Sequence, residues 1–380
     1  MTGTLDVSVA GVGMTPFESS AEASLLSLTT TAAQRAFGDA SVDPDSATSV
    51  HVGTALAEAL GAQSGLGNAL VSALGIEGVQ ADRVENTSAT GASAFHRGVQ
   101  AIESGASDIA LVVGAEKMSA GETADVTDVI SRLTHSREHV QGLTLPSFGG
   151  LAAGIYLDRY DVPRKALAEV PVRNHANAVH NPVAQFRKEI SVADVLDSPN
   201  VADPLRLFDC CPMSDGAAAV VLSRDGPIQV ASIGSGTGSH AVAERPDPLK
   251  IESVRLAGER TFGPTQYEPS DVDIACLHDA FSILEWLELE ALGFYERGEA
   301  WKATVDGATR IDGELPVNPG GGLKARGHPL GATGLSQLIE LVWQLRGDLP
   351  QQRQIAGAEL GFAINIAGFG NNSVCTLLET

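Results

Sequence analysis

The chain has 380 residues, of which 43% are hydrophobic, and it carries a formal net charge of −22. This length and apolar content suffice to bury a large core, and two similar lobes fit the length better than one. A strongly acidic surface repels nucleic-acid phosphates, which argues against a nucleic-acid partner. No apolar run reaches the roughly 18 residues that a membrane-spanning helix needs, so no membrane span is predicted.

Residues 1–9 lack the basic and then apolar pattern of a signal peptide. The four cysteines show no metal-ligand spacing, and adjacent Cys210 and Cys211 would form only a strained disulfide. A reducing, cytoplasmic location without a metal site is therefore predicted.

Acidic residues are spread over the whole chain, and only six of its 25 basic residues are lysines. High salt would screen the resulting repulsion, so we expect a halophilic source.

The first part of the chain alternates short apolar runs with amphipathic segments. Strands are expected at 5–13, 49–54, 82–86, 108–113 and 216–223, and helices at 21–37, 65–74 and 88–104. This alternation predicts an α/β fold with a mostly parallel sheet and helices on both faces.

Between about residues 118 and 207 the alternation stops, and glycine, proline and polar residues become frequent. Helices are expected there at 149–160 and 164–179. We interpret this region as an inserted loop domain. The predicted domains are therefore residues 1–117 with 208–225, the insertion 118–207, and residues 226–380.

The second half repeats the order of the first. Its expected strands are 228–234, 273–278, 362–366 and 373–378, and a glycine cluster at 320–322 precedes its central helix. Both halves contain Ala-Thr-Gly-x-Ser, at 89–93 and 332–336, at the start of a helix that runs to a terminal glycine. The sequence thus predicts duplicated halves whose two central helices begin at one pocket.

Three side chains near these helix starts are candidates for catalysis. Ser88 is either a capping residue or a nucleophile, placed where helix N–H groups can stabilise an oxyanion. His328 lies among glycines and is either a solvated loop residue or a general base beside a cavity. His278 ends an apolar strand, where open α/β sheets bind ligands, although a buried structural histidine is the alternative.

The motifs around these residues together resemble the thiolase superfamily. They are Glu85–Gly91, Asp215–Ala218, His278–Phe281 and Asn318–Gly321 followed by Gly327-His328-Pro329. The His-Asp-x-Phe motif is most similar to that of the archaeal and sterol-carrier-protein type. The resemblance covers nearly the whole chain and implies the thiolase fold, duplicated βαβαβ halves in α/β/α/β/α layers with an inserted loop domain.

The resemblance also implies roles for individual residues. The family's nucleophile corresponds to Ser88, its activating histidine to His328, and the residue that holds a catalytic water in one oxyanion hole to His278. Backbone N–H groups of Ser88 and of the turn Asn365–Gly370, which contains Gly368, correspond to the second oxyanion hole. Three further positions correspond to substrate binding, namely Asn318, Gly321 and Gly327.

Two departures from the family pattern concern the chemistry. The nucleophile is a serine rather than a cysteine, and the family's second cysteine is missing, since its two possible positions hold Ile364 and Ala280. We predict a β-ketothiolase that condenses two acyl-CoA molecules, or performs the reverse thiolysis, through an acyl-Ser88 intermediate. The alternatives are an inactive scaffold subunit and an acyl-CoA hydrolase that uses Ser88 and His328.

The resemblance further implies coenzyme A thioesters as substrates, with no cofactor and no metal. It implies a homo-oligomeric core, together with a small OB-fold, zinc-ribbon partner subunit that helps to bind CoA. Arg173, Arg187 and Lys188 in the insertion are the candidates for contacting the CoA phosphates from this chain, and the alternative for each is a solvated surface residue.

Overall fold

The computed structural model describes residues 5–380 and contains two similar halves that share one large sheet. The strands of the first half are β1 (Ser8–Met14), β2 (Ser49–Gly53), β3 (Gln80–Val84), β4 (Ala110–Lys117) and β7 (Asp215–Ser223). Those of the second half are β8 (Ile228–Thr237), β9 (Ile274–Cys276), β10 (Leu360–Ala367) and β11 (Asn372–Glu379). Their order across the sheet is β3-β2-β4-β7-β1-β8-β11-β10-β9. From the central β1–β8 pair outward, the first half has the order β1, β7, β4, β2, β3, and the second half has the order β8, β11, β10, β9. In each half the last strand in the sequence therefore lies next to the first, as the sequence repeat predicted.

The strand directions differ from the mostly parallel sheet expected from the alternation. Only β3–β2, β2–β4 and β10–β9 pair in parallel. Strands β7 and β11 run antiparallel to both of their neighbours, and β1 pairs antiparallel with β8. The reason is the connections: crossover helices make strand pairs parallel, whereas β7 enters from the insertion and β11 follows β10 through a short turn.

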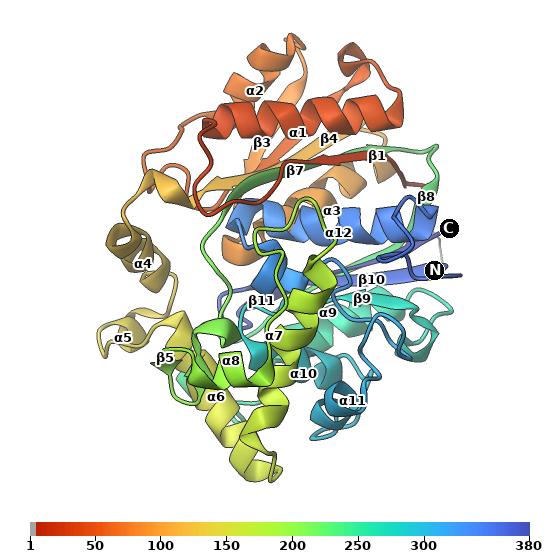
Figure 1. Cartoon of the computed structure of the whole chain (residues 1–380). Helices are drawn as coiled ribbons and strands as arrows, with labels where there is room; N and C mark the ends of the chain where they lie inside the picture. Colours follow the sequence, from red (N-terminus) through yellow and green to blue (C-terminus); the bar gives the residue numbers. More distant parts are fainter. Residues whose placement is uncertain (1–4) are drawn as a thin grey trace.

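Three layers of helices alternate with the two halves of the sheet, and Figure 1 shows these layers from top to bottom. Helices α1 (Leu25–Ala40) and α2 (Leu66–Leu74) cover the outer face of the first half. Helices α3 (Thr90–Glu103) and α12 (Leu330–Arg346) lie in the middle, and α9 (Glu252–Phe262) and α10 (Ser282–Ala291) form the last layer. The predicted α/β/α/β/α layering is confirmed.

The region between β4 and β7 folds mainly as helices. These are α4 (Thr123–Ser131), α5 (Ser136–His139), α6 (Leu145–Arg159), α7 (Arg164–Ala178) and α8 (Val192–Asp197), with a two-stranded sheet of β5 (Asn200–Ala202) and β6 (Leu205–Arg206). The helices expected at 149–160 and 164–179 correspond to α6 and α7. Helix α6 begins earlier because a Thr144–Ser147 capping box starts it. The exact limits of the three domains stay a prediction.

The central helix α12 is enclosed on all sides. Every residue from Leu330 to Leu345 except Trp343 is buried, including several polar ones. Polar side chains of the helix bind its surroundings: the Gln337 side-chain nitrogen donates to the Ile364 carbonyl, and Glu340 binds Arg353. A helix buried all round is held rigidly, so residues at its start have fixed positions.

Within the described residues, no helix combines the length and the apolar character that crossing a bilayer requires.

Candidate active site

The turn that carries Ser88 connects β3 to α3. Residues Thr87–Ala89 form a single 3-10 turn, and α3 begins at Thr90 with Ala89 as its N-cap and no side-chain capping bond. Ser88 is therefore not the cap of α3, and the capping interpretation of this residue is wrong. Its side chain is buried, with 4% exposure.

Thr87, immediately before Ser88, has a backbone conformation that is unfavourable for a β-branched residue. Its φ is 44°, and such left-handed conformations cost about 1–3 kcal/mol. Neighbouring groups hold it: the Glu85 carboxylate accepts its N–H at 2.6 Å, and the Thr90 hydroxyl donates to its carbonyl at 2.6 Å. The surroundings thus fix the backbone that presents Ser88.

The starts of α3 and α12 approach each other through glycines. A Cβ placed on Gly91 would lie 2.8 Å from the Gly331 carbonyl oxygen, and one on Gly334 would lie 2.3 Å from the Ala92 nitrogen. The turn Thr87–Ala89 also packs against α12 and β10. The starts of the two helices are therefore in contact, and one shared pocket at this place stays a prediction.

His328 lies just before α12 and is held through its backbone. The Ser214 hydroxyl accepts its N–H at 2.9 Å and itself donates to the Gln185 side-chain oxygen at 2.6 Å. Gly327, with φ of 113°, allows this contact, because a Cβ there would lie 2.8 Å from the Ser214 hydroxyl. The side chain of His328 is 6% exposed, so this residue is not a solvated loop histidine.

The hydrogen bond of the His328 ring determines which nitrogen can act as a base. Its Nδ1 lies 2.7 Å from the Thr333 hydroxyl, whose proton is directed to the Pro329 carbonyl at 2.9 Å. The hydroxyl oxygen therefore accepts from Nδ1–H. In a neutral ring this leaves the lone pair on Nε2, the nitrogen needed to remove a proton.

His278 follows β9 and faces His328. The two ring centres are 5.1 Å apart and the rings are nearly perpendicular, at 82°. The backbone N–H of His278 donates to the Glu288 carboxyl at 2.8 Å, and its Nδ1 lies 2.9 Å from the side-chain nitrogen of Asn365 on β10. Histidines from the two predicted motifs therefore meet in one buried place.

Both rings are neutral near neutral pH. Burial, with the nearby charges of Arg326 and Lys324, lowers the pKa of His328 to about 3. Burial, followed by repulsion from His328 and Lys324, lowers the pKa of His278 well below its usual value. The site can therefore both donate and accept protons without carrying a charged imidazole.

The glycine-rich segment before His328 is attached to the His278 motif. The Asn318 side-chain oxygen accepts the Leu277 N–H at 2.9 Å, while Asp279 accepts the Leu323 N–H at 2.7 Å. Gly321 has φ of 105°, and a Cβ there would lie 2.6 Å from that of Ala178. Asn318 and Gly321 thus shape the loop in this structure, and their contact with substrate stays a prediction.

Gly368 lies beside the Ser88 turn. It has φ of 59° and lines a cavity of about 360 Å³ together with Asn86 and Thr87, the residues before Ser88. The cavity therefore reaches the turn for which an oxyanion hole was predicted, while the role of the Gly368 N–H stays a prediction.

The cysteines do not provide an alternative nucleophile. All four are free, and burial raises the pKa of Cys210 to about 11 and that of Cys211 to about 12. Burial also raises the pKa of Cys276 and Cys375, so all four thiols are protonated near neutral pH. Over residues 5–380, no group of three or more His, Cys, Asp or Glu side chains is arranged to hold a metal ion.

Arg173 is not available for the CoA phosphates. Its guanidinium is buried, donates to Glu285 and Thr309, and contacts the Asn174 amide oxygen. The expectation that Arg173 contacts phosphate is therefore wrong for this conformation. The insertion retains Arg187 and Lys188, both of which are exposed.

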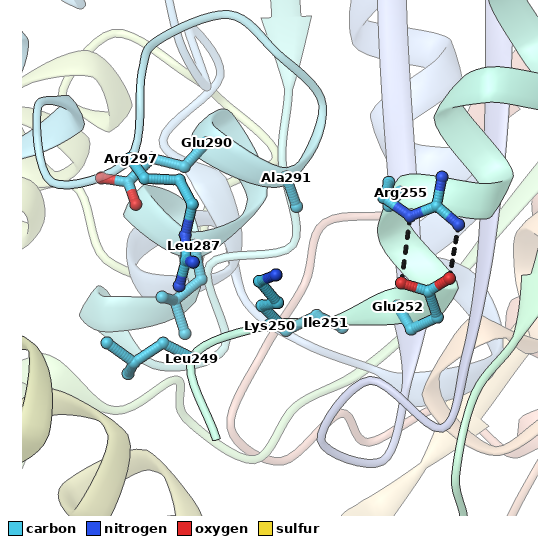
Figure 2. A pocket seen from close by; sticks show the side chains of 9 residues that line it. All are labelled: Leu249, Lys250, Ile251, Glu252, Arg255, Leu287, Glu290, Ala291 and Arg297. Carbon is cyan, nitrogen blue, oxygen red and sulfur yellow. Dashed lines mark hydrogen bonds and ion pairs between the residues drawn. The ribbon is translucent and has the colours of Figure 1, made fainter. Parts of the chain in front are cut away.

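A pocket of about 260 Å³ beside α9 and α10 also offers few free cations (Figure 2). Arg255 pairs with Glu252 and Glu259, and Arg297 pairs with Asp247. The pocket therefore adds little net positive charge for a polyanion.

Several residues support the histidines through contacts that the sequence did not predict. They are Thr333, Asn365, Ser214, Asp279 and Glu288. A polar residue inside an apolar strand, as Asn365 is in β10, was the available signal. Its partner His278, which follows β9, could not be read from the sequence.

Comparison with protein families gives two matches that together cover most of the chain. Residues 7–226 match the model of the thiolase N-terminal domain, and residues 234–380 match the thiolase C-terminal domain-like model. The chain belongs to the thiolase family. It is an acyltransferase of the thiolase type, as the sequence resemblance predicted.

Similar proteins agree with this assignment. An acetyl-CoA acetyltransferase of Methanothermobacter thermautotrophicus is 40% identical over 97% of this chain and 98% of its own length. Sterol carrier protein 2 of Bos taurus is 32% identical over 98% of this chain and 72% of its own length. The thiolase chain thus resembles both the archaeal and the sterol-carrier-protein type.

Solved structures share the fold at lower sequence identity. The Ltp2-ChsH2(DUF35) aldolase has a TM-score of 0.86 with 22% identity, covering 100% of this chain and 99% of that one. Human mitochondrial 3-ketoacyl-CoA thiolase has a TM-score of 0.76 with 17% identity, covering 98% of each chain. These matches confirm the thiolase fold of the chain.

Proposed function

We propose that this thiolase condenses two acetyl-CoA molecules, or cleaves the 3-ketoacyl product with CoA, through an acyl-Ser88 intermediate. The observation that carries the proposal is that the buried rings of His278 and His328 face each other just before α12, the helix that packs against the turn of the buried Ser88. The His328 ring has a free Nε2, and the His278 ring is neutral. The acetyl-CoA acetyltransferase relatives support the choice of substrate.

In the first step, the Ser88 hydroxyl oxygen attacks the thioester carbonyl while His328 Nε2 removes the hydroxyl proton. The carbon–sulfur bond then breaks, and the CoA sulfur leaves with the proton from His328. An acyl ester on Ser88 remains. Backbone N–H groups of Ser88 and of the Gly368 turn stabilise the oxyanion in this proposal.

In the second step, His328 removes a proton from the α-carbon of the second acyl-CoA. The resulting carbanion attacks the ester carbonyl, and the Ser88 oxygen leaves and recovers the proton. His278 stabilises the enolate oxygen, directly or through a bound water. The reaction uses CoA thioesters and no cofactor.

Mass spectrometry of the intact protein after incubation with acetyl-CoA tests the intermediate. We expect one acetyl group on Ser88, its absence in Ser88→Ala, and activity retained or increased in Ser88→Cys, because a thiol is the stronger nucleophile. An unacetylated wild-type protein would instead favour an inactive scaffold. CoA release from acetyl-CoA without acetoacetyl-CoA would favour a hydrolase.

The proposed assembly is a homo-oligomer with a small OB-fold, zinc-ribbon partner. Strand β3 is at the edge of the sheet and pairs only with β2 in the described chain, so it can extend the sheet of a second copy. The solved neighbour whose name includes a DUF35 component supports assembly with a second, different subunit. The reduced cysteines are compatible with the proposed cytoplasmic location.

A further inference from the structure

We propose that Asn365 is a positioning residue that keeps His278 in the tautomer with its proton on Nε2. In this form His278 donates a hydrogen bond, whereas His328 accepts a proton at its own Nε2. The inference rests on the proposed function for the role of His278. The tautomer itself is a property of the resting protein and can be measured without catalysis.

Asn365 is held in place before any substrate binds. It lies in the middle of β10, is 1% exposed, and pairs with Val374 of the neighbouring strand β11. Its side-chain nitrogen lies 2.9 Å from His278 Nδ1. An amide nitrogen can only donate, so His278 Nδ1 must accept, and a neutral ring then carries its proton on Nε2.

The opposite end of the amide indicates why the nitrogen faces His278. A Cβ placed on Gly334 would lie 2.4 Å from the Asn365 oxygen and 2.3 Å from the Ala92 backbone nitrogen. The oxygen therefore lies beside the first turns of α12 and α3, the positive ends of their helix dipoles. This oxygen accepts no hydrogen bond from the described residues, and the helix dipoles are what favour a carbonyl oxygen over an NH₂ group there.

The surroundings of His278 keep its ring neutral, so the only open question is which ring nitrogen carries the proton. Burial, and then the positive charge of Lys324, lower the pKa of His278, so the ring is neutral. The Glu288 carboxyl contacts its backbone N–H and not the ring. Asn365 is thus the group that decides which ring nitrogen of His278 carries the proton.

The consequence is a pair of adjacent neutral histidines with opposite roles. Thr333 leaves His328 Nε2 as an acceptor, while Asn365 leaves His278 Nε2 as a donor. A base next to a hydrogen-bond donor matches a reaction that removes a proton from carbon and places negative charge on the adjacent oxygen.

The first test is nitrogen NMR of protein labelled with ¹⁵N-histidine. The His278 signals are assigned by their loss in His278→Gln. We expect wild-type His278 to show a protonated Nε2 and an unprotonated Nδ1, and Asn365→Asp to show the reverse, because a carboxylate accepts from Nδ1–H. His51 on β2 is the internal reference: its Nδ1 lies 2.8 Å from the Asp82 carboxylate, in the other half of the sheet from β10, and its signals should not change. A wild-type His278 protonated on Nδ1 would overturn the proposal.

The second test separates the two half-reactions in Asn365→Asp. Acetylation of Ser88 should proceed at the wild-type rate, while kcat for condensation should fall about 10²- to 10³-fold, the effect of losing one oxyanion donor. The KM for acyl-CoA should change far less. Asn200→Asp, on an exposed strand of the insertion, controls for the added charge and should behave as wild type. Normal condensation with a reversed tautomer would overturn the proposed role.

Asn365→Leu decides the question if Asn365→Asp does not fold. Leucine is similar in size and makes no hydrogen bond, so His278 should populate both tautomers. The kcat for condensation should then fall less than it does in Asn365→Asp. A single unchanged tautomer in this variant would contradict the proposal. If wild-type Ser88 is never acetylated, the proposed function fails, while the NMR result still shows whether Asn365 sets the tautomer.

Discussion

His328 illustrates how burial prepares a base at the scale of one residue. Its ring is enclosed, its pKa is lowered to about 3, and its Nδ1–H is given to Thr333. A base of low pKa is weak in water, but here it removes the proton of a hydroxyl in a buried site. There, small charge separations are stabilised by nearby dipoles rather than by solvent.

The lowered pKa gives a prediction for the pH dependence of catalysis. An ordinary histidine base loses activity as the pH falls through about 6.5, because the protonated ring cannot accept a proton. The pKa of His328 is below this value, so the base stays neutral at lower pH. We expect kcat/KM for thiolysis to stay level between pH 8 and pH 5.5, as measured in buffers of constant ionic strength. An acid limb with an inflection near 6.5 would show that the catalytic base is solvated.

At the scale of elements, the glycines between α3 and α12 set the spacing of the catalytic groups. We expect Gly334→Ala to separate the Ser88 turn from His328, because its Cβ would overlap the Ala92 nitrogen and the Asn365 oxygen. Overpacking of this kind costs about 1–3 kcal/mol, and activity should fall by more than stability alone explains. Chemical unfolding and thiolysis assays on the same preparation measure both effects.

Gly38→Ala is the matched control for that substitution. Gly38 lies near the end of α1, is exposed, and a Cβ there meets nothing within 4 Å. Alanine should raise stability by up to about 1 kcal/mol and leave activity unchanged. If both variants retained full activity, the glycine contacts would not control the geometry of the site.

The sequence pattern predicted the elements well and their contacts less well. Repeated strands, terminal glycines and the two Ala-Thr-Gly-x-Ser motifs located both halves, because these signals depend on neighbours along the chain. The antiparallel placement of β7 and the contact of Asn365 with His278 depend on packing between distant segments. Arg173 looked like a free cation because its partner Glu285 is far away in sequence.

At the scale of the whole molecule, many positively charged side chains are buried or bound to other groups of the same chain. Lys324 and Arg326 are buried beside the histidines, Arg173 is bound to Glu285, and Arg245 donates to the Phe369 carbonyl. The net charge of −22 is carried by the remaining surface. CoA brings three phosphate groups to this surface, so its binding needs cations from elsewhere or strong screening by salt.

This charge distribution predicts that the isolated chain has little activity and that a small basic or zinc-ribbon partner restores it. Residues 1–380 are expressed alone and with the partner, and thiolysis of acetoacetyl-CoA is assayed at low and at multimolar salt. The oligomer size is measured in parallel. Salt alone should stabilise the fold, because it screens the repulsion between acidic residues, but it should not restore a low KM for CoA, since it also screens any cation that holds the phosphates. The partner should lower this KM, and the effect should be smaller for an acetoacetyl-pantetheine substrate, which lacks the nucleotide and its phosphates. Full activity of a homo-oligomer of this chain alone would show that its own cations suffice and that no partner is required.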